Sequence, residues 1–217
     1  MNGFYGIIAK KRENMQKGLF ITFEGADGCG KTTQLNLLKE YLLSKGYDVV
    51  LTREPGGKGL GEKIREILLN YDGEVSNRCE SFLFLADRAQ NIDVIVKPAI
   101  NNGKIVLCDR HTDSSVAYQG YGRGLDITEI DMLNNLATGG IKPDLTLVFD
   151  VDIETSMKRV GDEKDRMESS GIEFFNRVRN GYLELAKKEP HRIKVIDSTR
   201  KIEQVHSDVT DIINKYL

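Results

Sequence analysis

The fold of this chain is decided by one stretch, Gly25-Ala26-Asp27-Gly28-Cys29-Gly30-Lys31-Thr32, which reads G-x-x-x-x-G-K-T. Glycine adopts positive φ angles at little cost, so successive backbone N–H groups in such a loop can converge on phosphate oxygens. In loops of this pattern the lysine reaches the β- and γ-phosphates, and the hydroxyl of the last residue ligates Mg²⁺. The stretch therefore predicts a nucleoside triphosphate site.

The segments on either side have the order that this loop requires. Before it, residues 19–23 form an apolar, β-branched run that suits a buried strand. After it, Leu35, Leu38 and Leu42 fall on one face of a helix, and Gly46 suits its C-terminal cap. The positive end of that helix dipole would point at the same phosphates. This context favours a phosphate loop over an ordinary glycine-rich turn.

Strand and helix patterns alternate through the rest of the chain. Further strands are expected at 47–51, 104–108, 145–149 and 193–196. Helices are expected at 61–70, from 76 toward 97 with a kink or division at Pro98, from Asp126 to the Gly139-Gly140 pair, and over 202–213. This alternation predicts an α/β protein, a three-layer α/β/α fold with a five-stranded parallel sheet.

The composition indicates an ordinary globular domain. A chain of 217 residues with a formal net charge of −2 can bury a core but lacks the basic surface that a nucleic-acid duplex requires. No apolar run is long enough to cross a bilayer, and the start carries no signal-peptide pattern. Cys29, Cys79 and Cys108 have no metal-ligand or redox spacing, which indicates a cytoplasmic location.

We interpret residues 1–17 as an N-terminal extension and 18–217 as a single domain. Either Met1 or Met15 would be the natural start, because the first predicted strand begins only a few residues after Met15.

Charged residues follow the predicted strands where each one ends. Arg53-Glu54-Pro55 follows the second strand, Asp109-Arg110-His111 follows the third, and Asp150 and Asp152 follow the fourth. Ligands of open parallel sheets bind at the carboxyl ends of the strands. The sequence therefore predicts that the chemistry lies at this edge, beside the glycine-rich loop.

Several separate segments resemble the thymidylate kinase family, and they occur in the family's order. They are 23–34, Thr52-Arg53-Glu54-Pro55-Gly56-Gly57, Phe84-Leu85-Ala86-Asp87-Arg88-Ala89-Gln90, Asp109-Arg110-His111, Ser114-Ser115-Val116-Ala117-Tyr118-Gln119-Gly120, Arg123-Gly124-Leu125, Asp165-Arg166-Met167-Glu168 and Phe175-Asn176-Arg177-Val178-Arg179-Asn180-Gly181-Tyr182. The resemblance extends from about residue 18 to residue 197. A phosphate loop occurs in many families, but this ordered set is specific.

The resemblance implies a P-loop kinase fold with a short mobile lid at about 158–170. It implies transfer of the γ-phosphoryl group of ATP to dTMP with Mg²⁺, giving dTDP and ADP in dTTP biosynthesis. No general base is needed, because an oxygen of the dTMP phosphate is already a nucleophile at neutral pH. The protein must place two anions in line and offset the charge of the moving group. A homodimer is also implied.

The resemblance assigns roles residue by residue. Catalytic charges are expected from Lys31, Arg110, Arg159 and Arg166. ATP binding is expected from Gly25, Ala26, Asp27, Gly28, Cys29, Gly30, Lys31, Thr32 and Thr33. dTMP binding is expected from Asp27, Glu54, Pro55, Phe84, Arg88, Arg110, Ser115, Tyr118 and Gln119. Thr32 and Asp109 are expected to hold the Mg²⁺ ion.

Most of these residues also have a structural interpretation. Asp27 would be a solvated loop carboxylate, Asp109 would pair with an arginine to hold the fold, and Phe84 would belong to the core. Tyr118 would be a packing residue. The cations around the lid would be solvated surface charges.

Three local features depend on, or depart from, the family pattern. Glu54-Pro55 is expected to be a cis peptide by resemblance, although trans bonds predominate in general. The segment 159–165 is shorter and poorer in arginine than is usual, so the identity of the lid arginine stays open. His111 stands where Tyr or Phe is common, and it would stack while adding a pH dependence.

Three other functions remain as alternatives. The nearest is a kinase of the same fold that acts on another nucleoside or nucleotide. A nucleotide-dependent switch is a second, although no N-K-x-D guanine-reading motif is present. A DNA-associated ATPase is a third, and the charge balance disfavours it.

Overall fold

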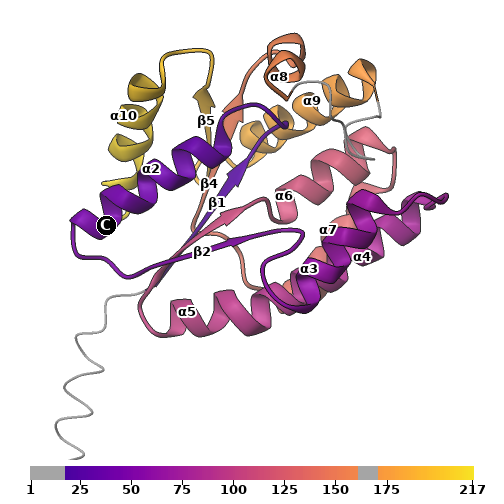
Figure 1. Ribbon diagram of the computed structural model, residues 1–217, viewed down its shortest axis with the longest axis horizontal. Coiled ribbons are helices and arrows are strands. Elements are labelled where there is room, and N and C mark those ends of the chain that lie inside the picture. The colour runs from indigo at the N-terminus through magenta and orange to yellow at the C-terminus, as the bar shows by residue number, and fades with distance from the viewer. Residues whose placement is uncertain (1–17, 161–170) are drawn as a thin grey trace, which may run out of the picture.

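The computed structural model of the chain describes residues 18–160 and 171–217 (Figure 1). Residues 1–17 and 161–170 lie outside the described part. The predicted N-terminal extension and the two candidate start residues therefore fall outside it. So does most of the predicted lid, with Lys164 and Arg166.

Five parallel strands form a sheet in the order β2-β3-β1-β4-β5. The strands are β1 (Leu19–Glu24), β2 (Val49–Arg53), β3 (Ile105–Asp109), β4 (Leu145–Asp150) and β5 (Ile193–Asp197). The predicted five-stranded parallel sheet is confirmed. The second strand lies two residues later than expected, because it pairs with β3 from Val49 opposite Ile105 to Arg53 opposite Asp109. That register depends on a partner strand and leaves no mark on the local apolar pattern.

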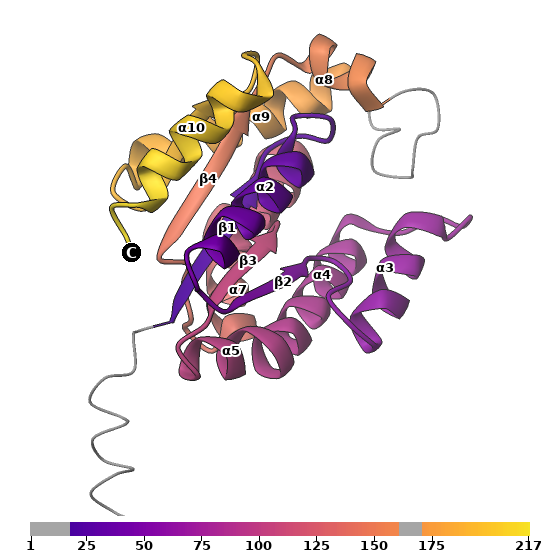
Figure 2. The same cartoon turned by 60° about the vertical axis from the view of Figure 1, so that its left-hand side comes forward.

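Helices cover both faces of the sheet (Figures 1 and 2). One face carries α2 (Lys31–Ser44) and α10 (Ile202–Ile213). The other carries α4 (Asn77–Asn91), η1 (Ile92–Val96), α5 (Lys97–Asn101), α6 (Thr112–Ser115), η2 (Val116–Gly122), α7 (Ile127–Thr138) and α9 (Ile172–Lys188). Helix α3 (Leu60–Asn70) packs on α4, and α8 (Ile153–Val160) packs on α9.

Alternation along the strands produces the two cores. In β3, Ile105 and Leu107 pack toward α2 and α10, whereas Val106 and Cys108 pack toward η1 and α5. Successive side chains of a strand point to opposite faces, so a parallel sheet covered on both sides is apolar at nearly every position. This burial fixes the carboxyl ends of β1 and β3 relative to one another.

Two predicted helix boundaries are confirmed, and one internal break differs. The Asp126 carboxylate caps α7 by accepting hydrogen bonds from the N–H groups of Thr128 and Glu129, and Gly139 ends that helix with a φ of 56°. Before Pro98 the backbone loosens into the π-helical segment η1. Pro98 lacks the N–H that would bond to the carbonyl four residues earlier, so the change begins before the proline.

Within residues 18–160 and 171–217, none of the helices has both the length and the apolar character needed to span a bilayer.

Candidate functional site

Two adjoining pockets open where β1 and β3 end. We call the first the phosphate-loop pocket; it is lined by Asp27, Gly28, Gly30, Lys31, Thr32, Thr33, Gln34, Asp109, Arg159, Ser198, Arg200, Ile202 and Val205. We call the second the arginine pocket; it is lined by Asp27, Glu54, Pro55, Arg65, Leu69, Phe84, Arg88, Arg110, Ser114, Ser115, Tyr118 and Gln119. Asp27 lines both pockets, so they meet at its carboxylate.

The phosphate loop joins β1 to α2 in the predicted order. A Cβ atom on Gly25 would lie 2.6 Å from the carbonyl oxygen of Phe149, so the loop passes too close to β4 for any larger residue. Gly30 has a φ of 95° and directly precedes the helix. Gly25, Ala26 and Cys29, which we expected to bind ATP, do not line the pocket. The side chains of Ala26 and Cys29 are buried in the core.

Lys31 is folded back onto its own loop. Its Nζ atom donates to the carbonyl oxygens of Gly25 and Ala26, at 3.1 and 3.0 Å, and lies 4.0 Å from the Asp27 carboxylate. The lysine therefore satisfies its charge with loop oxygens in this conformation.

The donors around Asp109 suit a hard cation. Its Oδ1 atom is buried and has no hydrogen-bond partner among the described residues. Asp109 lines the phosphate-loop pocket together with the exposed Thr32. A carboxylate and a hydroxyl beside a phosphate site are oxygen ligands of the kind Mg²⁺ takes, with water and phosphate oxygens completing its shell. This orphaned oxygen fits the predicted metal site better than the alternative ion pair.

Arg110 lies at the junction of the two pockets. Its φ of 69° is unusual for a residue other than glycine, and its backbone N–H bonds to the carbonyl of Phe23. The Nη2 atom donates to Asp27 at 2.8 Å, and the guanidinium lies 4.9 Å from the centre of the Tyr118 ring. Burial opposes ionisation of Asp27, but the charges of Arg110 and Lys31 outweigh it and lower the pKa of Asp27 to about 2.

Arg88 holds the wall of the arginine pocket. Only 1% of its surface is exposed. Its Nε atom donates to Glu54 at 2.8 Å, Nη1 donates to Ser115 and Asn134, and Nη2 donates to the backbone oxygen of His111. Most of its donors are thus engaged by the protein itself, which limits the direct ligand contact that we expected.

Glu54 is the acceptor at the centre of that wall. Besides Arg88 it accepts a hydrogen bond from Asn91 at 2.9 Å and lies 3.0 Å from Nδ1 of His111. Burial opposes its ionisation, yet the interactions with His111 and Arg88 lower the pKa of Glu54 to about 2. The Glu54-Pro55 peptide is cis, as the resemblance led us to expect.

The other residues expected at dTMP lie around the same pocket. Phe84 is half-buried and lines it, so Phe84 is not a member of the buried core clusters. Tyr118 does both things weighed above: it lines the pocket and packs edge-on against Phe174 and Tyr182.

Two expectations about strand-end residues are wrong. His111 does not reach a pocket: it is fully buried, packs edge-on against Phe20, and pairs with Glu54. Asp150 is held by Arg179 through two hydrogen bonds, and Asp152 caps α8 by accepting from the N–H of Thr155. Neither aspartate lines either pocket.

Arg159 is the described candidate for the lid charge. It lies near the end of α8, lines the phosphate-loop pocket, and makes long hydrogen bonds of 3.4 Å to the backbone oxygens of Gly28 and Ser198. Arg166, the other candidate, lies outside the described residues.

Sequence reasoning missed several residues that position the site. Asn91 and Asn134 bond to Glu54 and Arg88, and Asp87 accepts a hydrogen bond from the N–H of Gly56 beside the cis peptide. Burial raises the pKa of Asp87 to about 7. Asp87 belongs to a segment that resembles the family, but single polar residues on a helix gave no signal of these contacts.

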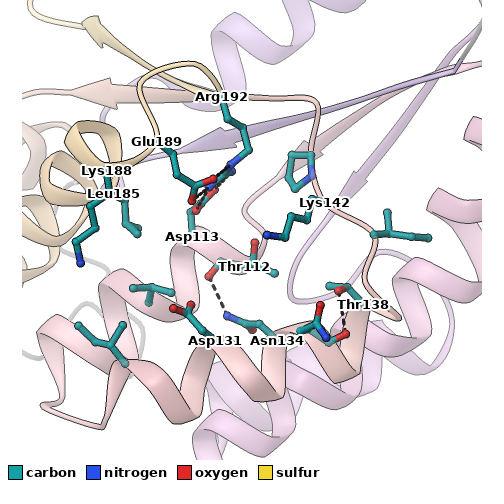
Figure 3. Close-up of a pocket in the computed structure, with 15 residues that line it drawn as sticks. Thr112, Asp113, Asp131, Asn134, Thr138, Lys142, Leu185, Lys188, Glu189 and Arg192 are labelled. Carbon is teal, nitrogen blue, oxygen red and sulfur yellow. Dashed lines mark hydrogen bonds and ion pairs between the residues drawn. The ribbon is translucent and has the colours of Figure 1, made fainter.

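A third pocket lies away from this edge, between α7, α9 and the loop before β4 (Figure 3). Its deepest charges neutralise one another, because Arg192 donates to both oxygens of Asp113 and also to Glu189. It has neither a glycine-rich loop nor a helix N-terminus aimed into it, so we do not assign the nucleotide chemistry to it.

Comparisons with known proteins agree with the site. The family model described as thymidylate kinase matches residues 23–209. A thymidylate kinase of Thermoanaerobacter sp. (strain X514) is 48% identical over 202 residues, covering 93% of this chain and all of the relative. One of Pelotomaculum thermopropionicum is 53% identical over 197 residues, covering 89% and 91%. The crystal structure of thymidylate kinase from Ehrlichia chaffeensis has a TM-score of 0.74 and 42% identity, covering 90% of this chain and 98% of that one. The chain therefore belongs to the thymidylate kinase family, whose members are ATP-dependent phosphotransferases that convert dTMP to dTDP.

Proposed function

We propose that the two adjoining pockets carry the family reaction on this chain, with ATP in the phosphate-loop pocket and dTMP in the arginine pocket. The observation that carries this proposal is their junction. Asp27 lines both pockets, and Arg110 grips its carboxylate at 2.8 Å. Two phosphate groups that meet there can lie in line for transfer, and most of the catalytic effect then comes from positioning and charge.

Lys31 and Arg110 are the cations that offset the charge of the moving phosphoryl group. Lys31 leaves the carbonyl oxygens of Gly25 and Ala26 and reaches the β- and γ-phosphates. Arg110 forks onto the dTMP phosphate with two parallel hydrogen bonds, as a planar guanidinium can and an ammonium cannot. Asp27 accepts a hydrogen bond from the 3′-hydroxyl of dTMP. The remaining residues of the loop, including Thr33, bind the ATP phosphates through backbone N–H groups.

Thr32 and Asp109 would hold Mg²⁺. When bound, the ion neutralises charge on the β- and γ-phosphate oxygens. The unpartnered Oδ1 of Asp109 supports this assignment.

The thymine ring stacks on Phe84, and Ser115, Tyr118 and Gln119 contact the base and sugar. Pro55 and Glu54 close the pocket from the β2 side. Arg88 acts chiefly through Glu54 and Ser115, because its donors are already engaged.

The lid supplies a further cation, and Arg159 is the described residue closest to that task. Arg159→Ala should raise the KM for ATP or lower kcat about tenfold, while Arg166→Ala tests the other candidate. A loss confined to the Arg166 variant would assign the role to Arg166.

An acceptor panel tests the function. Purified protein with ATP and Mg²⁺ is offered dTMP, dUMP, dCMP and dGMP, and ADP formation is followed. We expect dTMP to be preferred by kcat/KM. Preference for another acceptor would contradict the substrate, and ATP hydrolysis that no acceptor stimulates would favour a switch.

We also propose that two copies associate through α3, α4 and α7. Exposed apolar side chains support this: Met132 and Leu136 of α7 are 67% and 78% exposed, and Phe82 of α4 is 52% exposed. Residues four apart in a helix share one face. In light scattering, Leu136→Asp should convert a dimer to a monomer, whereas Leu43→Asp on α2 should not. A wild-type monomer at all concentrations would refute the dimer.

The proposed location is the cytoplasm, where both nucleotides and reduced cysteines occur.

A further inference from the structure

Glu24 is a buried carboxyl group that neither pocket uses directly. It is the last residue of β1, is fully buried, and lines neither the phosphate-loop pocket nor the arginine pocket. Burying a carboxyl group is costly unless its oxygens are hydrogen-bonded. Its Oε1 atom accepts the backbone N–H of His111 at 2.7 Å, and Oε2 faces Ser114 and Tyr182.

Three oxygen atoms form a closed triangle beside Arg110. Oε2 of Glu24 lies 2.6 Å from the Ser114 hydroxyl and 3.0 Å from the Tyr182 hydroxyl, and those two hydroxyls lie 2.8 Å apart. Two hydroxyl protons can fill only two of the three edges when Glu24 is ionised. One additional proton fills the third edge, so the triangle is complete when Glu24 is protonated.

The same two hydroxyls support the guanidinium of Arg110. Its Nη1 atom donates to Ser114 at 3.4 Å and to Tyr182 at 3.3 Å, while Nη2 donates to Asp27. The triangle joins β1, α6 and α9, so it fixes Arg110 against three separate elements. Arg110 is held by this scaffold on one side and by Asp27 on the other.

The charges around Glu24 determine its protonation. Burial and the carboxylate of Asp113 raise the pKa of Glu24 to about 7, although Ser114, Arg110 and the His111 N–H each work in the opposite direction. Asp113 itself is paired with Arg192 through two hydrogen bonds (Figure 3).

Two further titratable groups face Glu24. Cys108 of β3 is buried, and burial together with nearby carboxylates that include Glu24 raises the pKa of its thiol. Burial and then the Glu24 carboxylate likewise raise the pKa of the Tyr182 hydroxyl. Both groups therefore stay neutral while Glu24 titrates near neutral pH.

We propose that Glu24 is a positioning residue for the acceptor phosphate: through Ser114 and Tyr182 it holds Arg110, and the triangle takes up one proton from solvent when the anionic nucleotide binds. The inference rests on the proposed placement of dTMP at Arg110. A dianion beside this scaffold disfavours a carboxylate behind it, so Glu24 binds a proton to become a neutral acid. The added proton fills the vacant edge, and no other bond changes.

Glu24→Gln is the first test, because the amide resembles the protonated acid: its oxygen accepts from His111 and its NH₂ donates into the triangle. The KM for dTMP is measured from pH 6 to pH 9. A binding-linked rise of about one pKa unit weakens wild-type binding about tenfold across this range, and the Gln variant should lack that component. Both proteins should have similar kcat at pH 6.

Asp144→Asn is the matched control. Asp144 lies at the opposite end of the sheet, where its carboxylate accepts the N–H of Phe20. We expect the wild-type pH profile from this variant. If Glu24→Gln also retains the wild-type profile, or loses kcat equally at every pH together with thermal stability, the proposed role is refuted.

Proton uptake gives a second readout. Calorimetric titration of dTMP at pH 7 in buffers of different ionisation enthalpy measures the protons bound, and the difference between wild type and Glu24→Gln isolates this group. A fraction of a proton less in the variant supports the inference, and no difference overturns it. If the wild-type protein neither binds nor phosphorylates dTMP, the proposed function fails instead, so the two failures are distinguishable.

Discussion

The arginine pocket and the phosphate-loop pocket differ in how their charged groups are held. In the arginine pocket, Arg88 and Glu54 form a buried ion pair whose other donors and acceptors are also paired. In the phosphate-loop pocket, Lys31 bonds to carbonyl oxygens of its own loop, and Arg159 makes only long hydrogen bonds.

This difference teaches that one pocket is preorganised and the other must rearrange. A buried network whose members are all paired resists change, because an unpaired buried charge is costly. A lysine on backbone oxygens can exchange them for phosphate oxygens at little cost. Binding of the donor nucleotide should therefore move more side chains than binding of the acceptor.

The largest expected effect comes from removing the movable cation. Lys31→Met should lower kcat about 10³-fold, because a positive charge aimed at the transferred group is lost. The fold should persist, since the methionine keeps the length of the side chain. Steady-state kinetics and thermal unfolding measure the two quantities. Turnover close to wild type would show that the donor pocket does not depend on this rearrangement.

Arg110→Lys sharpens the comparison at the junction. We expect kcat/KM for dTMP to fall about 10²-fold, because two parallel hydrogen bonds become one point charge. Circular dichroism checks the fold. If kcat/KM stays near normal, Arg110 serves the scaffold alone and does not touch the acceptor phosphate.

Phe84→Ala separates the two pockets. The KM for dTMP should rise about tenfold through loss of a stacking surface, while the KM for ATP stays within about twofold. Both constants come from the same coupled assay with one substrate saturating. Equal changes in the two would mean that the phenyl ring supports the domain as a whole.

The smallest effect concerns acid stability of the preorganised wall. Because the pKa of Glu54 is lowered from 4.5 to about 2, its contribution to stability is present above pH 4.5 and is lost as the pH falls through about 2. Thermal unfolding from pH 2 to pH 6 should show a shallower acid decline for Glu54→Gln than for the wild type. Parallel declines would mean that this carboxylate is not the group responsible.

The strand order and the two pockets were predictable to different degrees. The apolar runs and the glycine-rich stretch were sufficient to predict the sheet and the position of the loop, because both signals are local. The resemblance named nine residues for dTMP, and all nine line the arginine pocket. Their individual contacts with a nucleotide stay predictions.

The misplaced residues share a physical cause. His111 and Asp150 follow strands as expected, yet their orientation depends on partners distant in sequence, Glu54 and Arg179. Likewise, the triangle at Glu24 involves β1, α6 and α9, and no spacing within one segment encodes it. Pairings between distant elements become visible only when the chain is folded.

The backbone of Arg110 constrains how this protein can change. Its left-handed φ of 69° is adopted most readily by glycine and asparagine, which carry no charge, whereas the guanidinium is needed in the pocket. Every replacement therefore gives up either charge, fork geometry or conformational ease. In a library of all single substitutions selected for growth, this codon should be among the least tolerant, and resistance to inhibitors that bind here should arise at neighbouring positions instead.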